Sequence, residues 1–227
     1  MRLMQCMEIN GRVKRQMLHL FQKIELRILM RITAEACGQV PPSLTGLTAG
    51  ECLAFYRYYT ADALSVRSRE ELSCFRREMY RRAYRVGRML SLLPGLNEKR
   101  KKRLIVFLYS NIGIDIVGSA GTIASMKSKS AQGSKEEQIS TKVQAADDVK
   151  ASTTAQAEDD RIIWKFYVPR CSFSAHYTPQ MCYVMSGLDA GIICGIFGGG
   201  SLKFYRRLTE GYPACSAVFC REFKRKK

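Results

Sequence analysis

The sequence predicts an α+β fold in which N-terminal helices pack on a small antiparallel sheet. Helical periodicity dominates the chain up to about residue 116, and residues 162–168 are β-branched and aromatic. The remainder has the pattern strand–helix–strand–strand, and helices followed by strands are typical of α+β proteins. We expect one domain built from a basic helical region (1–124) and a strand–helix–strand–strand unit (161–223). A mobile insertion or linker (125–160) separates them, and a basic tail (224–227) follows.

Four N-terminal helices are predicted from apolar spacing and from residues that begin helices. The predicted helices span residues 12–37, 49–65, 69–93 and 97–116. Their start signals are two pairs with capping-box spacing and one N-cap, namely Thr48/Glu51, Ser68/Glu71 and Asn97. Pro41-Pro42 ends the first helix and Pro94-Gly95 the third.

The first helix carries an apolar stripe with basic residues on its other faces. The members of this stripe are Met17, Leu20, Phe21, Ile24, Ile28 and Ile32. We interpret the stripe as the face that packs into the core. The alternative is a helix that lies on anionic lipid or nucleic acid, because its other faces are cationic.

Residues 125–160 differ in composition from both flanks, since they contain no aromatic residue and no proline. The flanks 113–122 and 162–168 resemble ordered structure, so we expect them to meet in space on either side of a long loop. A helix should begin at Thr178-Pro179 and end at Gly198. Strands are predicted at 201–208 and 214–223.

The chain is strongly basic, with 37 Lys and Arg against 20 Asp and Glu and a net charge of +17. Such a charge attracts nucleic acid, anionic lipid or small anions. An arginine-rich third helix could contact phosphates, but no nucleic-acid motif accompanies it. Segments 104–124 and 181–202 are weakly charged, yet each holds an Asp and several Gly and Ser residues, so we expect no membrane span.

The nine cysteines do not form a disulfide framework in this interpretation, because the N-terminus lacks the apolar region of a secretory signal. We therefore expect a cytoplasmic protein with reduced thiols. No CxxC pair occurs and the cysteine spacings match no zinc signature, so we expect no metal. No phosphate-binding loop or dinucleotide fingerprint occurs, so we expect no cofactor.

Asp189 is the strongest candidate site residue, since it lies in an apolar helix where an isolated carboxylate is costly. Cys182 and Ser186 share its helix face. Asp189 is either catalytic or structural, and in the structural case it caps a nearby backbone group or pairs with Arg170 or Arg206. His176, one of two histidines, is a candidate proton carrier or a structural residue.

Three glycines recur every four residues on an adjoining face of that helix: Gly187, Gly191 and Gly195. Glycine costs about 1 kcal/mol per helical position relative to alanine, so this repeat indicates a compensating close approach of a strand, another helix or a ligand. The two interpretations are tight packing of the helix against the sheet and the floor of a ligand pocket.

The C-terminal segment resembles the L-2-amino-thiazoline-4-carboxylic acid hydrolase family over residues 165–220. The resemblance rests on Cys171 followed by an aromatic residue, on Ser-Gly-Leu-Asp189, and on the segments 202–206 and 208–219. It implies hydrolysis of a C–N bond other than a peptide bond, which opens a small cyclic amidine-like carboxylic acid. A similar layout occurs in ligand-sensing domains of the 4-vinyl-reductase type.

The same resemblance assigns roles to residues of this chain. Asp189 would be the general base or orient the attacking group, and Cys182 or Cys215 would be the nucleophile or a substrate contact. His176 joins this catalytic set as the candidate proton carrier named above. Arg206 or Arg207 would bind the substrate carboxylate, and Cys171 and Ser186 complete the expected substrate-binding set. The family commonly has a cysteine where Ser186 stands here, and this departure favours a module that binds a small molecule without catalysis.

Three functions are therefore open: a ring-opening hydrolase, a non-catalytic small-molecule-binding module, and a basic adaptor for nucleic acid or membrane. The first two predict a pocket that contains Asp189, with a small anion as the expected ligand. The third predicts salt-dependent binding to anionic polymers or vesicles.

Overall fold

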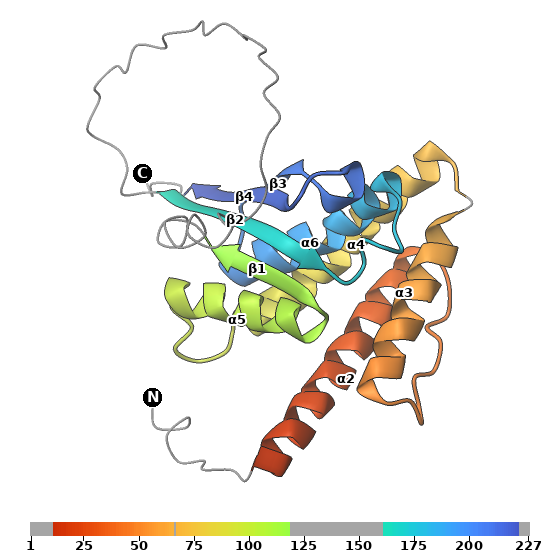
Figure 1. The fold of residues 1–227 in the computed structure, drawn as a ribbon. Coiled ribbons are helices and arrows are strands. Elements are labelled where there is room, and N and C mark those ends of the chain that lie inside the picture. The colour runs from red at the N-terminus through yellow and green to blue at the C-terminus, as the bar shows by residue number, and fades with distance from the viewer. Residues whose placement is uncertain (1–10, 66, 119–160, 223–227) are drawn as a thin grey trace, which may run out of the picture.

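The computed structural model describes residues 11–65, 67–118 and 161–222 (Figure 1). Over this part of the chain the structure is α+β, which confirms the predicted class. The helices are α2 (Gly11–Ala36), α3 (Ala49–Ser65), α4 (Arg69–Leu90), α5 (Glu98–Asn111) and α6 (Pro179–Phe197). The strands are β1 (Ile114–Gly118), β2 (Arg161–Cys171), β3 (Ser201–Arg206) and β4 (Cys215–Glu222), and a short 3₁₀ turn, η2 (Leu208–Glu210), lies between β3 and β4.

The predicted capping residues begin the helices. The backbone N–H of Thr48 donates to Glu51 Oε2 at 2.7 Å, and the N–H of Glu51 donates to Thr48 Oγ1 at 3.3 Å. Ser68 and Glu71 form the same reciprocal pair at the start of α4. These bonds satisfy backbone donors that have no partner within the first helical turn. At its other end α4 stops at Leu90, three residues before its predicted end.

The four strands form one antiparallel sheet in the order β1-β2-β4-β3. The helix predicted over residues 97–116 is too long, because α5 ends at Asn111 and Ile114–Gly118 is a strand. Gly113 breaks the helix with a φ of +76°, a conformation that side chains with a Cβ rarely adopt. β1 pairs with β2, which confirms that the two flanks meet. The insertion 125–160 and the tail 224–227 lie outside the described residues.

Helix α6 lies between the sheet and α4, and most of its side chains are buried (Figure 1). On the sheet side, the Phe197 ring stacks on Phe219 of β4 with centroids 4.6 Å apart. Within the described part of the chain it is the one helix long and apolar enough to cross a membrane, and 72% of its apolar window is buried inside the fold. A helix that is apolar all round is expected at the centre of a core.

The glycine face of α6 packs on α4 and not on the sheet, which corrects the packing partner proposed from the sequence. A Cβ added at Gly191 would lie 2.5 Å from the Tyr80 carbonyl oxygen, and one at Gly195 would lie 2.4 Å from that of Tyr84. Gly87 of α4 faces the same contact between the two helices, since a Cβ added there would lie 2.4 Å from the Ile192 carbonyl oxygen. The backbones of α4 and α6 are therefore closer than they could be if these positions carried side chains.

The apolar stripe of α2 does not face the core, so this sequence-based interpretation is wrong. Its members Met17, Leu20, Phe21, Ile24 and Ile28 are 39–53% exposed, and only Ile32 is buried. The core side of α2 is formed instead by Leu26, Leu29, Met30 and Thr33. The helix thus has two apolar faces, of which one is only partly covered by the described residues.

Candidate functional site

Asp189 lies on α6 and points toward α5. The hydroxyl of Tyr109 donates to Asp189 Oδ1 at 2.9 Å. Burial raises the pKa of Asp189 from 3.8 to about 6, while the Tyr109 hydrogen bond and the charge of Arg207 act in the opposite direction. The carboxyl is therefore mainly ionised at pH 7 and mainly protonated at pH 5.

Neither arginine proposed from the sequence is the hydrogen-bond partner of Asp189. Arg170 pairs with Asp115 of β1, with its Nε 2.7 Å from Asp115 Oδ2. Arg206 is exposed and lies over the ring of Tyr212 at 5.5 Å. Asp189, which keeps a small exposed fraction, accepts its hydrogen bond from a neutral donor, so its charge is only partly compensated.

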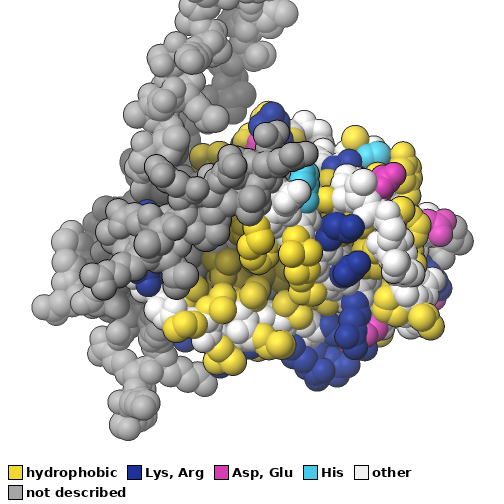
Figure 2. Space-filling view, turned by 90° about the horizontal axis from the view of Figure 1, so that it is seen from below, with side chains coloured by type: hydrophobic (Ala, Val, Ile, Leu, Met, Phe, Trp, Pro, Cys, Tyr) yellow, Lys and Arg dark blue, Asp and Glu magenta, His cyan; other side chains and the backbone are white. Residues whose placement is uncertain are grey.

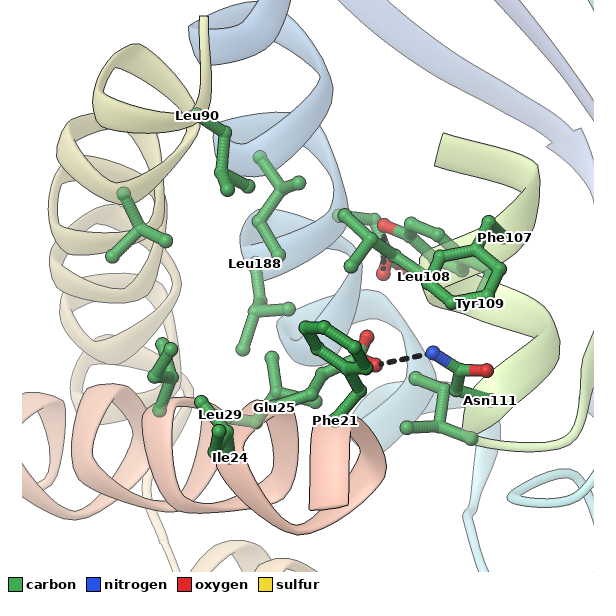
Figure 3. A pocket seen from close by; sticks show the side chains of 15 residues that line it. Phe21, Ile24, Glu25, Leu29, Leu90, Phe107, Leu108, Tyr109, Asn111 and Leu188 are labelled. Atoms are coloured by element: carbon green, nitrogen blue, oxygen red, sulfur yellow. Dashed lines mark hydrogen bonds between the residues drawn. The ribbon is translucent and has the colours of Figure 1, made fainter. Parts of the chain in front are cut away.

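Asp189 lines a pocket of about 270 Å³ between α2, α4, α5 and α6 (Figure 3). Most of its wall is apolar, from residues that include Phe21, Ile24, Leu29, Leu90, Phe107, Leu108 and Leu188. A second carboxyl, Glu25, enters it from α2 and accepts a hydrogen bond from Asn111 Nδ2 at 3.3 Å. Burial raises the pKa of Glu25 from 4.5 to about 8, and the Asn111 bond opposes this shift. Glu25 is thus mainly protonated at pH 7.

Tyr109 contributes a phenol to the same wall. Burial and the nearby charge of Asp189 raise the pKa of Tyr109 well above 10, so the hydroxyl remains protonated. The pocket therefore combines apolar walls with two acids, one phenol donor and one carboxamide. Pockets that bind small molecules commonly have this composition, in which a few polar groups fix the orientation of a mainly apolar ligand.

A smaller cavity of about 70 Å³ lies beside Asp189 and brings it together with Cys171 and Cys182. Burial raises the pKa of Cys171 to about 12 and that of Cys182 to about 11. Burial also raises the pKa of Cys215, whose sulfur accepts the Leu208 N–H at 3.3 Å. These thiols are therefore uncharged at neutral pH, whereas a cysteine nucleophile reacts as the thiolate.

The other predicted site residues lie apart from the pocket. The exposed His176 ring packs edge-on against Tyr58, with centroids 5.6 Å apart. The buried Ser186 hydroxyl donates to the Tyr183 carbonyl oxygen of its own helix at 2.6 Å. Arg207 pairs with Glu210 at 3.0 Å and acts on Asp189 through its charge. The structure thus gathers Asp189 with two of the predicted cysteines, and it does not bring His176, Ser186 or Arg206 to them.

Glu25, Tyr109 and Asn111 belong to the site but were not predicted from the sequence. Glu25 could have been found, because it is the one acidic residue in the basic segment 11–34 and stands between two apolar residues, Ile24 and Leu26. Tyr109 and Asn111 carry no such signal, since their roles depend on how α5 packs. Within the parts of the chain that the structure describes, no group of three or more His, Cys, Asp or Glu residues is placed to hold a metal.

Comparison with known proteins adds no assignment to this geometry. No family model, curated protein or solved structure matches the chain. The residues of the pocket and their chemistry are therefore the basis on which a function can be proposed.

Proposed function

We propose that this domain binds an apolar small molecule that carries a protonated amine. The observation that supports this proposal is an apolar pocket of about 270 Å³ whose lining includes two carboxylic acids, Glu25 and Asp189. An engineered apolar cavity of about 150 Å³ is large enough to bind benzene, so this pocket is large enough for a compact ligand. Burial of the apolar part of the ligand supplies the driving force.

The polar end of the ligand follows from the pKa values of the two acids. Both are raised by burial, which means that each carboxylate lacks sufficient compensating positive charge. A cation placed between them would supply that charge, whereas an anion would be repelled. The pocket therefore favours a cationic group over the small anion expected from the net charge.

This ligand class predicts a pH dependence. Glu25 is mainly protonated at pH 7, so binding of an ammonium group should release its proton. Affinity should consequently rise as the pH increases through about 8, as long as the amine remains protonated. An alcohol of the same length should show no such rise.

The test compares three probes of equal chain length: octylamine, 1-octanol and octanoate. Calorimetry on the full chain should show octylamine bound most tightly, with proton release at pH 7. Glu25→Gln should abolish the proton release, and Asp189→Asn should weaken octylamine about tenfold, a loss of about 1.4 kcal/mol. Asp62→Asn removes an exposed carboxylate of α3 and serves as the matched control. Equal affinity for the three probes, or identical binding by Asp189→Asn and Asp62→Asn, would refute the proposal.

A ring-opening hydrolase is the second candidate, and the pKa of Asp189 favours it. A carboxyl with a pKa of about 6 is well suited to act as a general base near neutral pH. In that mechanism Asp189 removes a proton from a water molecule that attacks the C=N carbon of a cyclic amidine-like acid. The assay is conversion of 2-amino-thiazoline-4-carboxylate by the full chain and by Asp189→Asn and Cys182→Ser. Turnover that both variants retain would exclude this chemistry at Asp189.

A further inference from the structure

The partly exposed apolar face of α2 continues through Ile28 and Ile32 into a groove between α2 and α4. This α2–α4 groove has a volume of about 530 Å³ and is lined by Ile28, Arg31, Ile32, Glu35, Arg82, Arg85, Val86, Met89, Leu90 and Leu93. Met89 is 70% exposed and Leu93 is 47% exposed. Viewed from the side on which α2 lies, hydrophobic side chains gather around a hollow, with Lys and Arg side chains beside them (Figure 2). Exposed apolar surface of this kind marks an interaction site.

The rim of the groove is positively charged. Its lining contains three arginines against one glutamate, a net charge of +2. Arg31 and Arg82 share Glu35, with Arg31 Nε 2.7 Å from Glu35 Oε1. Arg85 is exposed and pairs with no acid in the described segments. Carboxylates of a partner could therefore form ion pairs with the arginines at the edge of the apolar groove.

We propose that the α2–α4 groove docks an amphipathic helix of an acidic partner protein. The apolar stripe of that helix would cover Ile28, Met89 and Leu93, and its flanking Glu or Asp residues would face Arg31 and Arg85. The exposed stripe of α2 from Met17 to Ile28 is about 17 Å long at 1.5 Å per residue, so a partner helix of three to four turns would cover it.

Two other occupants fit the surface less well. A second copy of this chain would bring an equally basic surface against the arginines, because the chain has a net charge of +17. An anionic membrane matches the charge, but a bilayer surface is broad and flat and would leave the floor of a groove unfilled. A helix has the shape to enter the groove and can carry the opposite charge.

This inference goes beyond the proposed ligand and can be tested separately. Ile28, Val86 and Leu90 line both the groove and the pocket, whereas Arg85, Met89 and Leu93 line only the groove. Variants of the latter three residues should leave octylamine binding unchanged. Loss of helix docking in these variants can therefore be distinguished from loss of the pocket.

The experiment uses fluorescence anisotropy with an 18-residue labelled peptide that carries leucines at helical spacing and glutamates elsewhere. One matched peptide has lysine in place of glutamate, and another has the same composition in scrambled order. We expect the full chain to bind the acidic amphipathic peptide at micromolar concentration. Met89→Glu should weaken it at least tenfold, and Arg85→Glu should weaken it several-fold and reduce its salt dependence. Tyr58→Glu, on an exposed tyrosine of α3, should bind like the wild type.

Several results would overturn the inference. Equal binding of the acidic, basic and scrambled peptides would show that the groove does not select an acidic helix. Wild-type affinity in a folded Met89→Glu variant would place the peptide elsewhere. Vesicles containing phosphatidylserine that bind the wild type but not Met89→Glu would make a membrane the occupant. Dimerisation in sedimentation velocity that Met89→Glu abolishes would assign the groove to a second copy.

Discussion

Replacement of Gly195 by alanine should destabilise the protein, although alanine is the better helix former. The new Cβ would lie 2.4 Å from the carbonyl oxygen of Tyr84 and 2.8 Å from the Cα of Gly87. Ordinary contacts of a Cβ begin at about 3.4 Å, so α4 and α6 would have to move apart by roughly 1 Å. The obstructing atoms are backbone atoms, which cannot move aside as the end of a long side chain can.

The magnitude follows from two opposing contributions. Overpacking a well-packed interior costs about 1–3 kcal/mol, and alanine regains about 1 kcal/mol of helix propensity. Because separation of the helices also loosens the contacts at Gly187 and Gly191, we expect the cost to lie near the upper limit. The net loss in the free energy of unfolding should be about 2 kcal/mol.

Urea denaturation measures this loss as a lower midpoint at an unchanged slope. Gly50→Ala is the matched control, because Gly50 is also helical and a Cβ there would have no neighbour within 4 Å. That variant should gain up to about 1 kcal/mol. If Gly195→Ala were as stable as the wild type while Gly50→Ala showed its gain, the close contact between α4 and α6 would be refuted.

Three further predictions concern other parts of the fold. The contribution of Asp189 to the unfolding free energy should fall by up to about 3 kcal/mol as the pH rises from about 4 to 6, because folded Asp189 retains its proton up to a pKa of about 6 and the unfolded chain only up to about 3.8. Urea unfolding at pH 4 and pH 7 should show a smaller fall in Asp189→Asn than in the wild type, with the part caused by the raised pKa of Glu25 remaining, and an unchanged pH dependence would contradict the assignment. Ser68→Ala should cost about 1 kcal/mol in thermal unfolding through loss of the α4 cap, and an unaltered melting temperature would argue against that cap. Iodoacetamide at pH 7.5 should alkylate the exposed Cys74 well before Cys171 or Cys182, and peptide mass spectrometry that found Cys182 modified at the same rate would contradict its burial.

The features that could be predicted from the sequence are those set by local chemistry. The starts of α3, α4 and α6 follow from the capping side chains of Thr48, Ser68 and Thr178, and the end of α6 follows from the left-handed backbone of Gly198. Each of these effects acts within a single helical turn. Strand β1 was missed although a signal was present. Gly113 and the β-branched residues after it favour a helix end followed by a strand, but apolar residues continue on both sides of the polar Ser110-Asn111 pair, and this pattern favoured one longer helix.

The site could be predicted only in part, because its partners come from distant segments. Asp189 was recognisable as a polar residue in an apolar helix, and this local anomaly is independent of tertiary structure. Its hydrogen bond from Tyr109 spans 80 residues, so no local pattern could indicate it. The outward orientation of the α2 stripe was missed for a related reason. Apolar periodicity predicts that a face will be covered, but not whether the covering surface belongs to the same chain.

The sheet order has a consequence for synthesis on the ribosome. Strand β4 is the last strand in the chain and lies between β2 and β3, so these two strands do not pair directly with each other in the native sheet. Residues 215–222 must therefore leave the ribosome before β2 and β3 can each pair with β4. Helices α3 and α4 need only local contacts and can form as soon as they emerge. During that interval the apolar α6 has its α4 contact but not the packing of Phe197 on Phe219 of β4.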